Sequence, residues 1–510
     1  MTRNIRFGGA SFSLIVIVFL AALGPLQFGF HIAELNAPQD ALTCKSKKPI
    51  SSSLAAQLSR WFSSSSASSS SSSSLFPSCI PMTEAAFASI SSIFTLGGLA
   101  GALAAGPVTT LTGRRPAMRM TSAFFLLGAL LETVAGGVPL LFLGRLVAGV
   151  GAGAATVIVP LYVSEVAPPA ARGLFGTSTQ VMINMGILLT QIEGYFLSHG
   201  AAWRWILASG VGLAALHVVG LHVVPESPAW LASKGRFGAA RKELRRIRGS
   251  RADVADETAG WGDFDVTSGG SSAEEQGLLS PGPGMLAPAD KPALGFLEVL
   301  GDPDALQGIV ACVGIATGQQ LCGINSIIMY SVSLLNDLLP VSSALLTILI
   351  SLVNLGTTLA CAPLPDRLGR RRCLLLSIAG QGSSSLLLAF SIQAGFKALS
   401  ALAVLSFVAW FAVGLGPVPF IMASELVGPD AVGAAQSWTL GANYVATFVI
   451  AQFFPVANSW LNGLLGGAGW IYYVFGAAAA AVWGFVYLQV PETRGKRNAD
   501  EVWGRERRLD

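Results

Sequence analysis

Apolar stretches, each of about 20 residues, recur along this chain from near its first residue to near its last, and an α-helix needs about that length to cross the hydrocarbon core of a bilayer. Charged residues make up only 12% of the chain. A soluble domain carries about twice that share. The pattern therefore predicts an all-α, polytopic membrane protein.

Twelve of these stretches are expected to be membrane-spanning helices. They lie at about residues 11–36, 83–109, 117–137, 139–164, 174–198, 203–224, 304–335, 340–364, 373–396, 399–427, 433–457 and 468–490. The first follows two arginines, as a signal peptide would. Its apolar region is too long for a cleaved signal, however, and no small-residue cleavage site follows, so it is expected to remain as a helix.

Most arginines that flank these spans would lie on one side of the membrane. They are Arg3, Arg6, Arg114, Arg115, Arg119, Arg172, Arg367, Arg370, Arg371, Arg372 and those of RKELRRIR (241–248) and RGKR (494–497). Short loops on the other side carry little beyond Arg204 and Lys397. Because cytoplasmic loops are enriched in Lys and Arg, both termini are expected to be cytoplasmic. The net charge of +4 is weak and gives no reason to expect a nucleic-acid partner.

Two polar insertions interrupt the spans. Residues 40–82 contain a serine-rich tract that cannot form a core and is predicted to be disordered on the non-cytoplasmic side. Cys44 and Cys79 flank it. The sequence is compatible with a disulfide between them and with two free thiols, because their spacing alone does not establish the geometry that a disulfide needs. Residues 232–302 are expected to be a cytoplasmic linker with basic helices along the membrane surface. The other cysteines have no metal-ligand spacing, so no metal site is predicted.

The two sets of six spans repeat each other. TGRR (112–115) corresponds to LGRR (368–371), and PES (225–227) corresponds to PET (491–493), at offsets of about 260 residues. Duplicated halves are typical of alternating-access transporters. The expected organisation is a first half at 1–231, the linker at 232–302, a second half at 303–490 and a cytoplasmic tail at 491–510.

Together the motifs resemble the sugar porter family of the major facilitator superfamily, and within it the facilitative glucose transporters. The similar stretches are LQFGFHIAELNAPQ (26–39), GRLVAGVGAG (144–153), PLYVSEVAPPAARG (160–173), PESP (225–228), GQQLCGIN (318–325), DRLGRR (366–371), GLGPVP (414–419) and PETRG (491–495). The stretch at residues 26–39 is most similar to that of a fungal branch of this family. The resemblance implies two pseudo-symmetric six-helix halves, the major facilitator fold, that carry a monosaccharide by alternating access.

The resemblance also implies a sugar site in a central cavity. Neutral amides suit sugar hydroxyls because they both donate and accept hydrogen bonds. The amides at matching positions are Gln180, Gln319, Gln320, Asn325, Asn354 and Asn443, and Ile183, Phe411, Phe420 and Tyr444 are expected beside them. For any single amide, a hydrogen bond between helices is the alternative. Ala412 and Phe420 replace the family's usual Glu and Trp, so a lower affinity for glucose or another preferred sugar is expected.

Charged residues at the cytoplasmic ends match the family's gate. They are Arg114, Arg115, Glu165, Arg172 and Glu226 in the first half, and Asp366, Arg370, Arg371, Glu425 and Glu492 in the second. Ion pairs among them are expected to hold the halves together while the cavity opens outward. Anchoring by positive charge is the alternative. Val432 stands where the family has Arg, so one pair is lost and an inward-biased resting state is expected.

Proton-coupled relatives pair an Asp in the first helix with an Arg in the fourth. Arg145 matches that Arg, while His31 stands at the Asp position and Glu34 lies three residues on, on the same helical face. Because a buried Arg needs a counter-ion, Glu34 is expected to pair with Arg145, either as structure or, with His31, as a proton site. Glu132 and Glu193 are further acidic residues that the sequence does not place.

A passive hexose facilitator, functional as a monomer and without a cofactor, is the first expectation. A proton–sugar symporter is the second. A non-transporting sugar sensor is the third, and the short tail after Pro491 argues against it. The four histidines are dispersed and no phosphate loop is present, so no enzyme is expected. Plasma membrane and vacuolar membrane both suit the topology.

Overall fold

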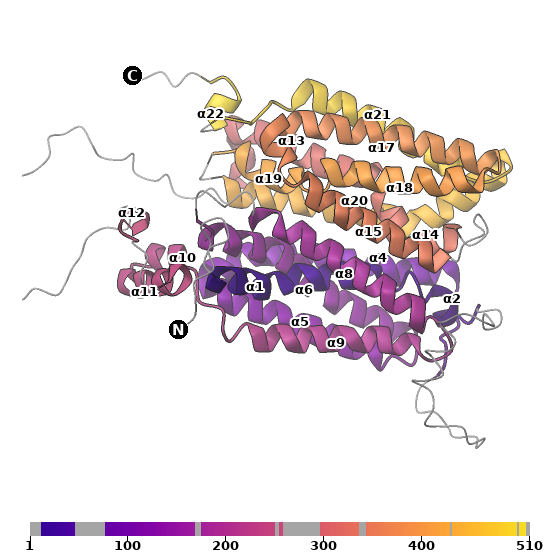
Figure 1. The fold of residues 1–510 in the computed structure, drawn as a ribbon, viewed down its shortest axis with the longest axis horizontal. Helices are drawn as coiled ribbons and strands as arrows, with labels where there is room; N and C mark the ends of the chain where they lie inside the picture. The colour runs from indigo at the N-terminus through magenta and orange to yellow at the C-terminus, as the bar shows by residue number, and fades with distance from the viewer. Residues whose placement is uncertain are drawn as a thin grey trace, which may run out of the picture.

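The computed structural model describes residues 12–45, 77–168, 175–249, 254–258, 296–335, 343–428, 431–496 and 499–505. Within these ranges the regular elements are all helices, arranged as two bundles side by side (Figure 1). The serine-rich segment 46–76, for which disorder is predicted, and residues 259–295 of the linker lie outside the described residues.

The first half holds six long helices. They are α1 (Phe12–Ala33), α4 (Glu84–Thr112), α5 (Arg114–Thr133), α6 (Val138–Val166), α8 (Ser178–Leu197) and α9 (Trp203–Gly220). The short helix α2 (Gln39–Leu42) follows α1, and α10 (Pro228–Ser233), α11 (Phe237–Arg248) and α12 (Ala255–Thr258) follow α9. Each of the six spans expected in this half corresponds to one long helix.

The second half holds the other six spans, two of them broken. Its helices are α13 (Pro303–Leu321) with α14 (Ile324–Leu335), α15 (Ser343–Cys361), α17 (Arg370–Gln393), α18 (Lys397–Val413) with α19 (Val418–Glu425), α20 (Val432–Leu465) and α21 (Trp470–Gln489). The short elements are η4 (Glu298–Gly301), α16 (Leu364–Leu368) and α22 (Ala499–Val502).

Eight helices in the described part of the chain are long and apolar enough to cross a membrane, or nine if the bent pair α13–α14 is one span. The remaining three long helices are α5, α8 and α15. In α5 and α8 polar and charged side chains interrupt the apolar run, and α15 counts only as a shorter apolar helix. Twelve helical spans in two halves are thus consistent with the predicted fold.

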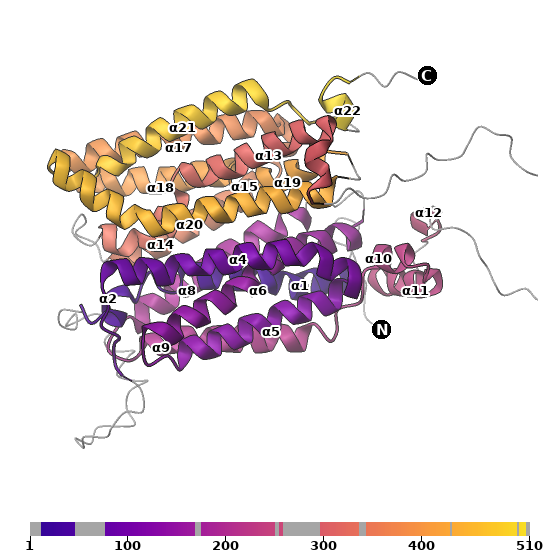
Figure 2. The ribbon, with the colours of Figure 1, turned by 180° about the vertical axis from the view of Figure 1, so that it is seen from behind.

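The two ends of the bundles differ in chemistry. One end carries Arg114, Arg115, Arg370 and Arg371 at the starts of α5 and α17, and we call it the arginine end. Helices α10 and α11 lie beyond this end of the first half (Figure 2). The opposite end carries a disulfide between Cys44 and Cys79, with their Cα atoms 5.3 Å apart, and we call it the disulfide end. The pairing left open by the sequence is therefore a disulfide.

Glycines allow helices of the first half to approach closely. A Cβ on Gly153 of α6 would collide with the carbonyl oxygen of Gly98 on α4, and one on Gly149 would collide with that of Phe94. Gly29 of α1 and Gly186 of α8 are in the same situation at the α1–α8 contact. Small residues serve this purpose where helices associate in lipid.

Two breaks interrupt helices of the second half at the level of the cavity described below. Gly323 has φ +91° between α13 and α14, a conformation that favours glycine, and the two helices meet at a 43° bend. GLGP (414–417) separates α18 from α19, and Pro417 cannot donate a backbone hydrogen bond there. Broken helices of this kind are tolerated at membrane depth where they line a cavity.

Candidate functional site: a central cavity between the two halves

A cavity with an empty volume of about 720 Å³ lies between the halves. It is lined by Phe28, Ile32, Thr95, Thr156, Gln180, Ile183, Asn184, Ile187, Gln319, Gln320, Ile324, Asn325, Ile328, Asn354, Phe411, Phe420, Leu440, Asn443, Tyr444 and Thr447. Most of its wall is apolar with a few polar groups, as is usual for small-molecule sites. The set includes all ten residues predicted from the sequence to bind substrate.

The amides of α13, α14 and α20 form one connected network. Asn443 donates to Gln319 Oε1 at 2.6 Å and accepts from Gln320 Nε2 at 3.2 Å. Asn325 donates to Gln320 Oε1 at 2.7 Å. Gln319 also donates to the carbonyl of Leu415 in the break between α18 and α19. The network therefore fixes the amides against the broken segments, and its members can exchange these bonds for those of a polar solute.

A second set of amides joins the halves across the cavity. Gln180 donates to Asn184 Oδ1 at 3.1 Å, both on α8. Asn184 in turn donates to Asn354 Oδ1 at 3.2 Å and to Thr358 Oγ1 at 2.8 Å, both on α15 of the other half. Relative motion of the halves would break these bonds, so polar contacts of the cavity are linked to its opening.

Aromatic rings form the apolar part of the wall. Tyr444 hydrogen-bonds Thr156 across the halves at 3.0 Å, and its ring packs against Gly98. Phe28 lies edge-on to Tyr444, with ring centroids 6.4 Å apart. Phe411 and Phe420 lie on the second-half side. Rings beside amides give a surface that suits a solute with both apolar faces and hydroxyl edges.

A smaller cavity of about 480 Å³ continues the central one toward the arginine end. The two share Thr156, Gln319, Phe420, Leu440 and Asn443. The smaller cavity extends past Pro160 near the end of α6 and Gln436 near the start of α20. The free space between the halves therefore runs from the middle toward this end.

The disulfide end is closed by hydrogen bonds between the halves. Asn36, just after α1, donates to the carbonyl of Ile328 on α14 at 2.9 Å. Ser92 of α4 donates to Gln452 Oε1 of α20 at 2.6 Å, and Gln452 donates to Ser89 Oγ at 3.3 Å. α4 packs along α20 in the same region. The cavity is thus shut off on this side in the present conformation.

The charged residues of the expected gate pair within each half. In the first half, Arg114 makes a bidentate pair with Glu165 at 2.9 and 2.7 Å. Glu226 accepts from the backbone N–H groups of Arg114 at 2.9 Å and Arg115 at 3.2 Å. Arg172 lies outside the described residues.

The second half repeats this arrangement. Arg370 contacts Glu425 and Asp366, each at 3.0 Å, and Glu492 accepts from the backbone N–H of Arg370 at 2.8 Å. Arg371 donates to the carbonyl of Tyr487 at 2.5 Å. These pairs hold helices of one half to each other, because each Arg begins a helix whose neighbours in the same half present the carboxylates. Pairs between the halves are expected when the cavity opens outward, whereas here the free space runs toward the arginine end, so that pairing stays a prediction.

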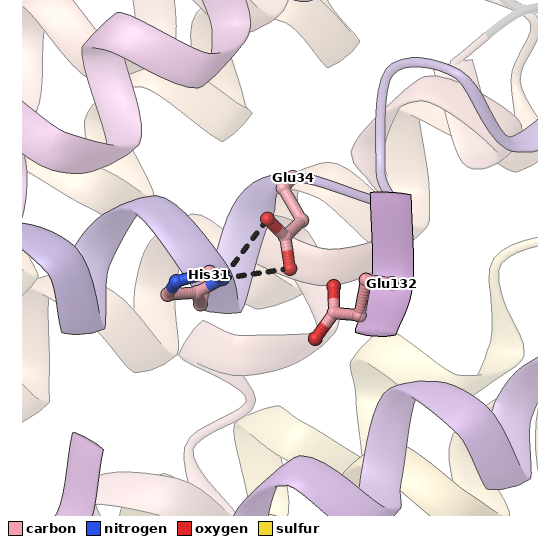
Figure 3. Close-up of side chains that lie close together, drawn as sticks. All are labelled: His31, Glu34 and Glu132. Carbon is pink, nitrogen blue, oxygen red and sulfur yellow. Dashed lines mark hydrogen bonds and ion pairs between the residues drawn. The ribbon is translucent and has the colours of Figure 1, made fainter. Parts of the chain in front are cut away.

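A buried ionic cluster lies outside the cavity, toward the disulfide end. Arg145 NH1 is 2.6 Å from Glu34 Oε1, the pair that the sequence predicts. His31 Nδ1 is 3.0 Å from both oxygens of Glu34. Figure 3 shows that Glu132, at the end of α5, points into the same cluster. The guanidinium of Arg145 lies over the ring of Phe94, 4.5 Å from its centroid.

Several of these residues were missed by sequence reasoning. Asn184 lies one helical turn after Gln180, so the i, i+4 rule could have placed it on the same face. Thr156 and Thr447 line the cavity from helices that already carry predicted residues or motifs. Glu132 had no such signal, because only the packing of α5 against α6 and α1 brings it to Glu34.

The cluster is the one group of His, Cys, Asp and Glu side chains in the described ranges whose ligand atoms could approach a common metal ion. The positive charge at that place comes from Arg145 instead. The cavity itself presents amides, hydroxyls and rings, a set that suits a neutral polar solute rather than a metal or a charged cofactor.

Comparison with known proteins agrees with this architecture. The family model described as sugar (and other) transporter matches residues 17–502. A probable metabolite transport protein of Saccharomyces cerevisiae is 34% identical over 491 residues, which cover 96% of this chain and 95% of the yeast protein. The human solute carrier family 2, facilitated glucose transporter member 4, is 30% identical over 503 residues, which cover 96% of this chain and 90% of the human protein.

Among solved structures, the xylose transporter XylE of E. coli in a partially occluded inward-open conformation has the same fold. Its TM-score is 0.71 at 22% identity, covering 96% of this chain and 100% of XylE. Since the family model spans nearly the whole chain, this protein belongs to the sugar (and other) transporter family.

Proposed function

We propose that this protein carries a hexose across a membrane by alternating access, with the central cavity as the binding site. The observation that supports it best is the set of seven uncharged amides that the two halves of the molecule present to one cavity. Each hydrogen bond to a sugar hydroxyl contributes about 1 kcal/mol net, so several are needed for useful affinity. Relatives whose names specify facilitated glucose transport support this substrate class.

The test is uptake of labelled glucose by purified protein in liposomes, with a panel of other hexoses and xylose as competitors. Saturable equilibration that a competing sugar inhibits is the expected result. Sugar binding without uptake would instead indicate a sensor, and neither binding nor uptake for any sugar in the panel would contradict the proposal.

Passive transport is the first reading of the mechanism, and proton coupling is the second. The observation that favours coupling is the buried cluster of His31, Glu34 and Arg145. Uptake should be measured with and without an inward proton gradient. Accumulation above the outside concentration that a protonophore abolishes would establish a symporter, and Glu34→Gln should then make uptake insensitive to pH. Equilibration that ignores the gradient would establish a facilitator.

The charged clusters at the arginine end are proposed to act as clamps within each half, so that each half moves as one body. We place this end in the cytoplasm, because positively charged loops favour that side. A plasma or vacuolar membrane location and function as a monomer complete the proposal. No catalytic role is assigned to the protein.

A further inference from the structure

A second carboxyl group accompanies Glu34 in the buried cluster, and the transport scheme above leaves it unused. Glu34 is 1% exposed and Glu132 is 0% exposed. A carboxyl oxygen of each and a ring nitrogen of His31 all lie within 4.8 Å of one another (Figure 3). Two acidic side chains therefore share one site closed to solvent.

The charges of this cluster do not balance. The guanidinium of Arg145 pairs with Glu34 at 2.6 Å, and His31 is the remaining titratable group in contact. Around it, Glu193 of α8 is held by Ser209 at 2.6 Å, and Tyr330 of α14 donates to the carbonyl of Ala451. Two carboxylates against one guanidinium leave one negative charge in excess. An unpaired charge in the interior is costly, and such sites take up a proton instead.

The hydrogen-bond partners indicate where that proton resides. Neither oxygen of Glu132 meets an N–H or O–H donor of another described residue, and the group beside it is the carboxyl of Glu34. A proton on either acid creates an O–H that can donate to the other carboxyl group, which no other described donor reaches from the Glu132 side. A proton on His31 would instead leave its Nε2–H without an acceptor among the described residues.

We propose that Glu34 and Glu132 share one proton, forming a buried proton-binding site that holds the disulfide end closed. The ligand class follows from the charge count, because one proton makes the cluster neutral whereas a divalent cation would leave it positive. When the pH rises and the proton leaves, two adjacent carboxylates repel each other and attract water. That opposes burial of the turn that follows α1.

The same turn carries the contact between the halves. Asn36, two residues after Glu34, donates to the carbonyl of Ile328 at 2.9 Å, and Ile328 lines the cavity. On the other side of the cluster, Arg145 lies over Phe94, whose ring stacks on Phe28 of the cavity wall at 6.1 Å. The site therefore touches both the closure at the disulfide end and the wall of the cavity.

Infrared difference spectroscopy tests the shared proton directly, using the purified full chain in detergent without sugar. Wild type should show a carboxylic-acid C=O band that shifts in D₂O and disappears as the pH is raised. Glu132→Gln should lose the band, whereas Glu193→Gln, the matched change at a neighbouring half-buried acid, should retain it. Absence of the band in wild type, or an unchanged band in Glu132→Gln, would overturn the proposal. So would loss of the band on adding Zn²⁺ or Mn²⁺ at constant pH.

The wild-type measurement stands even if Glu132→Gln does not fold, which size-exclusion chromatography would reveal. Closure is tested with Thr95→Cys in the cavity wall, labelled by an impermeant thiol reagent added at the disulfide end. The labelling rate should rise several-fold over the same pH interval in which the band disappears. A rate independent of pH would overturn the link to closure. Neither readout needs sugar, so a failure here is distinct from a failure of the proposed transport function.

Discussion

Individual amide side chains of the cavity wall are hydrogen-bonded to one another. Gln320 contacts three of them, Gln319, Asn325 and Asn443, at 3.3, 2.7 and 3.2 Å. A polar group in a largely apolar cavity would be costly if it were unpaired. The network therefore satisfies the amides of the cavity wall, and its members can exchange these hydrogen bonds for hydrogen bonds to a sugar.

Replacing Gln320 by Ala should weaken sugar binding. The change removes a donor and an acceptor, and one or two lost hydrogen bonds correspond to about a tenfold rise in KM. Initial uptake rates in liposomes over a range of glucose concentrations measure the effect. Gln489→Ala, which removes an exposed amide at the end of α21, is the control and should leave KM unchanged. Equal KM values for the two variants would remove Gln320 from the site.

Pairs of helices depend on close backbone contact, most clearly α4 with α6. Gly149 and Gly153 of α6 each face a carbonyl oxygen of α4 with no room for a side chain. Gly106, by contrast, lies on α4 with open space where its Cβ would be. Substitution by Ala at Gly106 changes helix propensity alone, whereas substitution at Gly149 also changes the packing of α4 against α6.

Gly149→Ala should destabilise the protein, because overpacking a contact costs about 1–3 kcal/mol. Gly106→Ala is the control and should be neutral or slightly stabilising, since Ala favours a helix over Gly by about 1 kcal/mol. The midpoint of thermal unfolding in detergent measures both. A Gly149→Ala variant as stable as wild type would mean that α4 and α6 can separate without loss.

At the scale of helices, the sequence predicts the fold where the length and apolarity of a segment determine whether it spans the membrane. The twelve spans followed from the apolar runs, and the ten cavity residues followed from the motifs that resemble those of the family. The partner of a charged side chain could not be predicted from the sequence where the packing of helices determines it. Arg114 and Arg370 have several carboxylates in reach, and Glu132 meets Glu34 only because α5 packs beside α6 and α1.

The whole molecule is held in one conformation by a few contacts between its halves. At the disulfide end these include the bonds of Gln452 to Ser92 and Ser89. On the opposite side the smaller cavity extends between the halves. Since alternating access exchanges the closed side for the open one, each bond at the disulfide end biases the equilibrium.

Gln452→Ala should shift this equilibrium toward opening at the disulfide end. Two hydrogen bonds are lost in the closed state alone, and about 1 kcal/mol for each gives roughly a ten- to thirtyfold change in the ratio of the states. Labelling of Thr95→Cys from the disulfide end reports the change. Asn462→Ala is the matched control on the same helix, because its partner Asn458 is also on α20. Equal labelling rates in the two variants would rule out Gln452 as a closing contact.

The disulfide has a practical consequence for engineering. Cys44 and Cys79 bring the two ends of the intervening segment to neighbouring points, with Cα atoms 5.3 Å apart. A folded domain whose own termini lie close together can therefore be grafted between them without pulling α2 away from α4. An epitope or fluorescent reporter inserted there would mark one face of the membrane, and its accessibility in intact cells would establish which way the transporter is oriented.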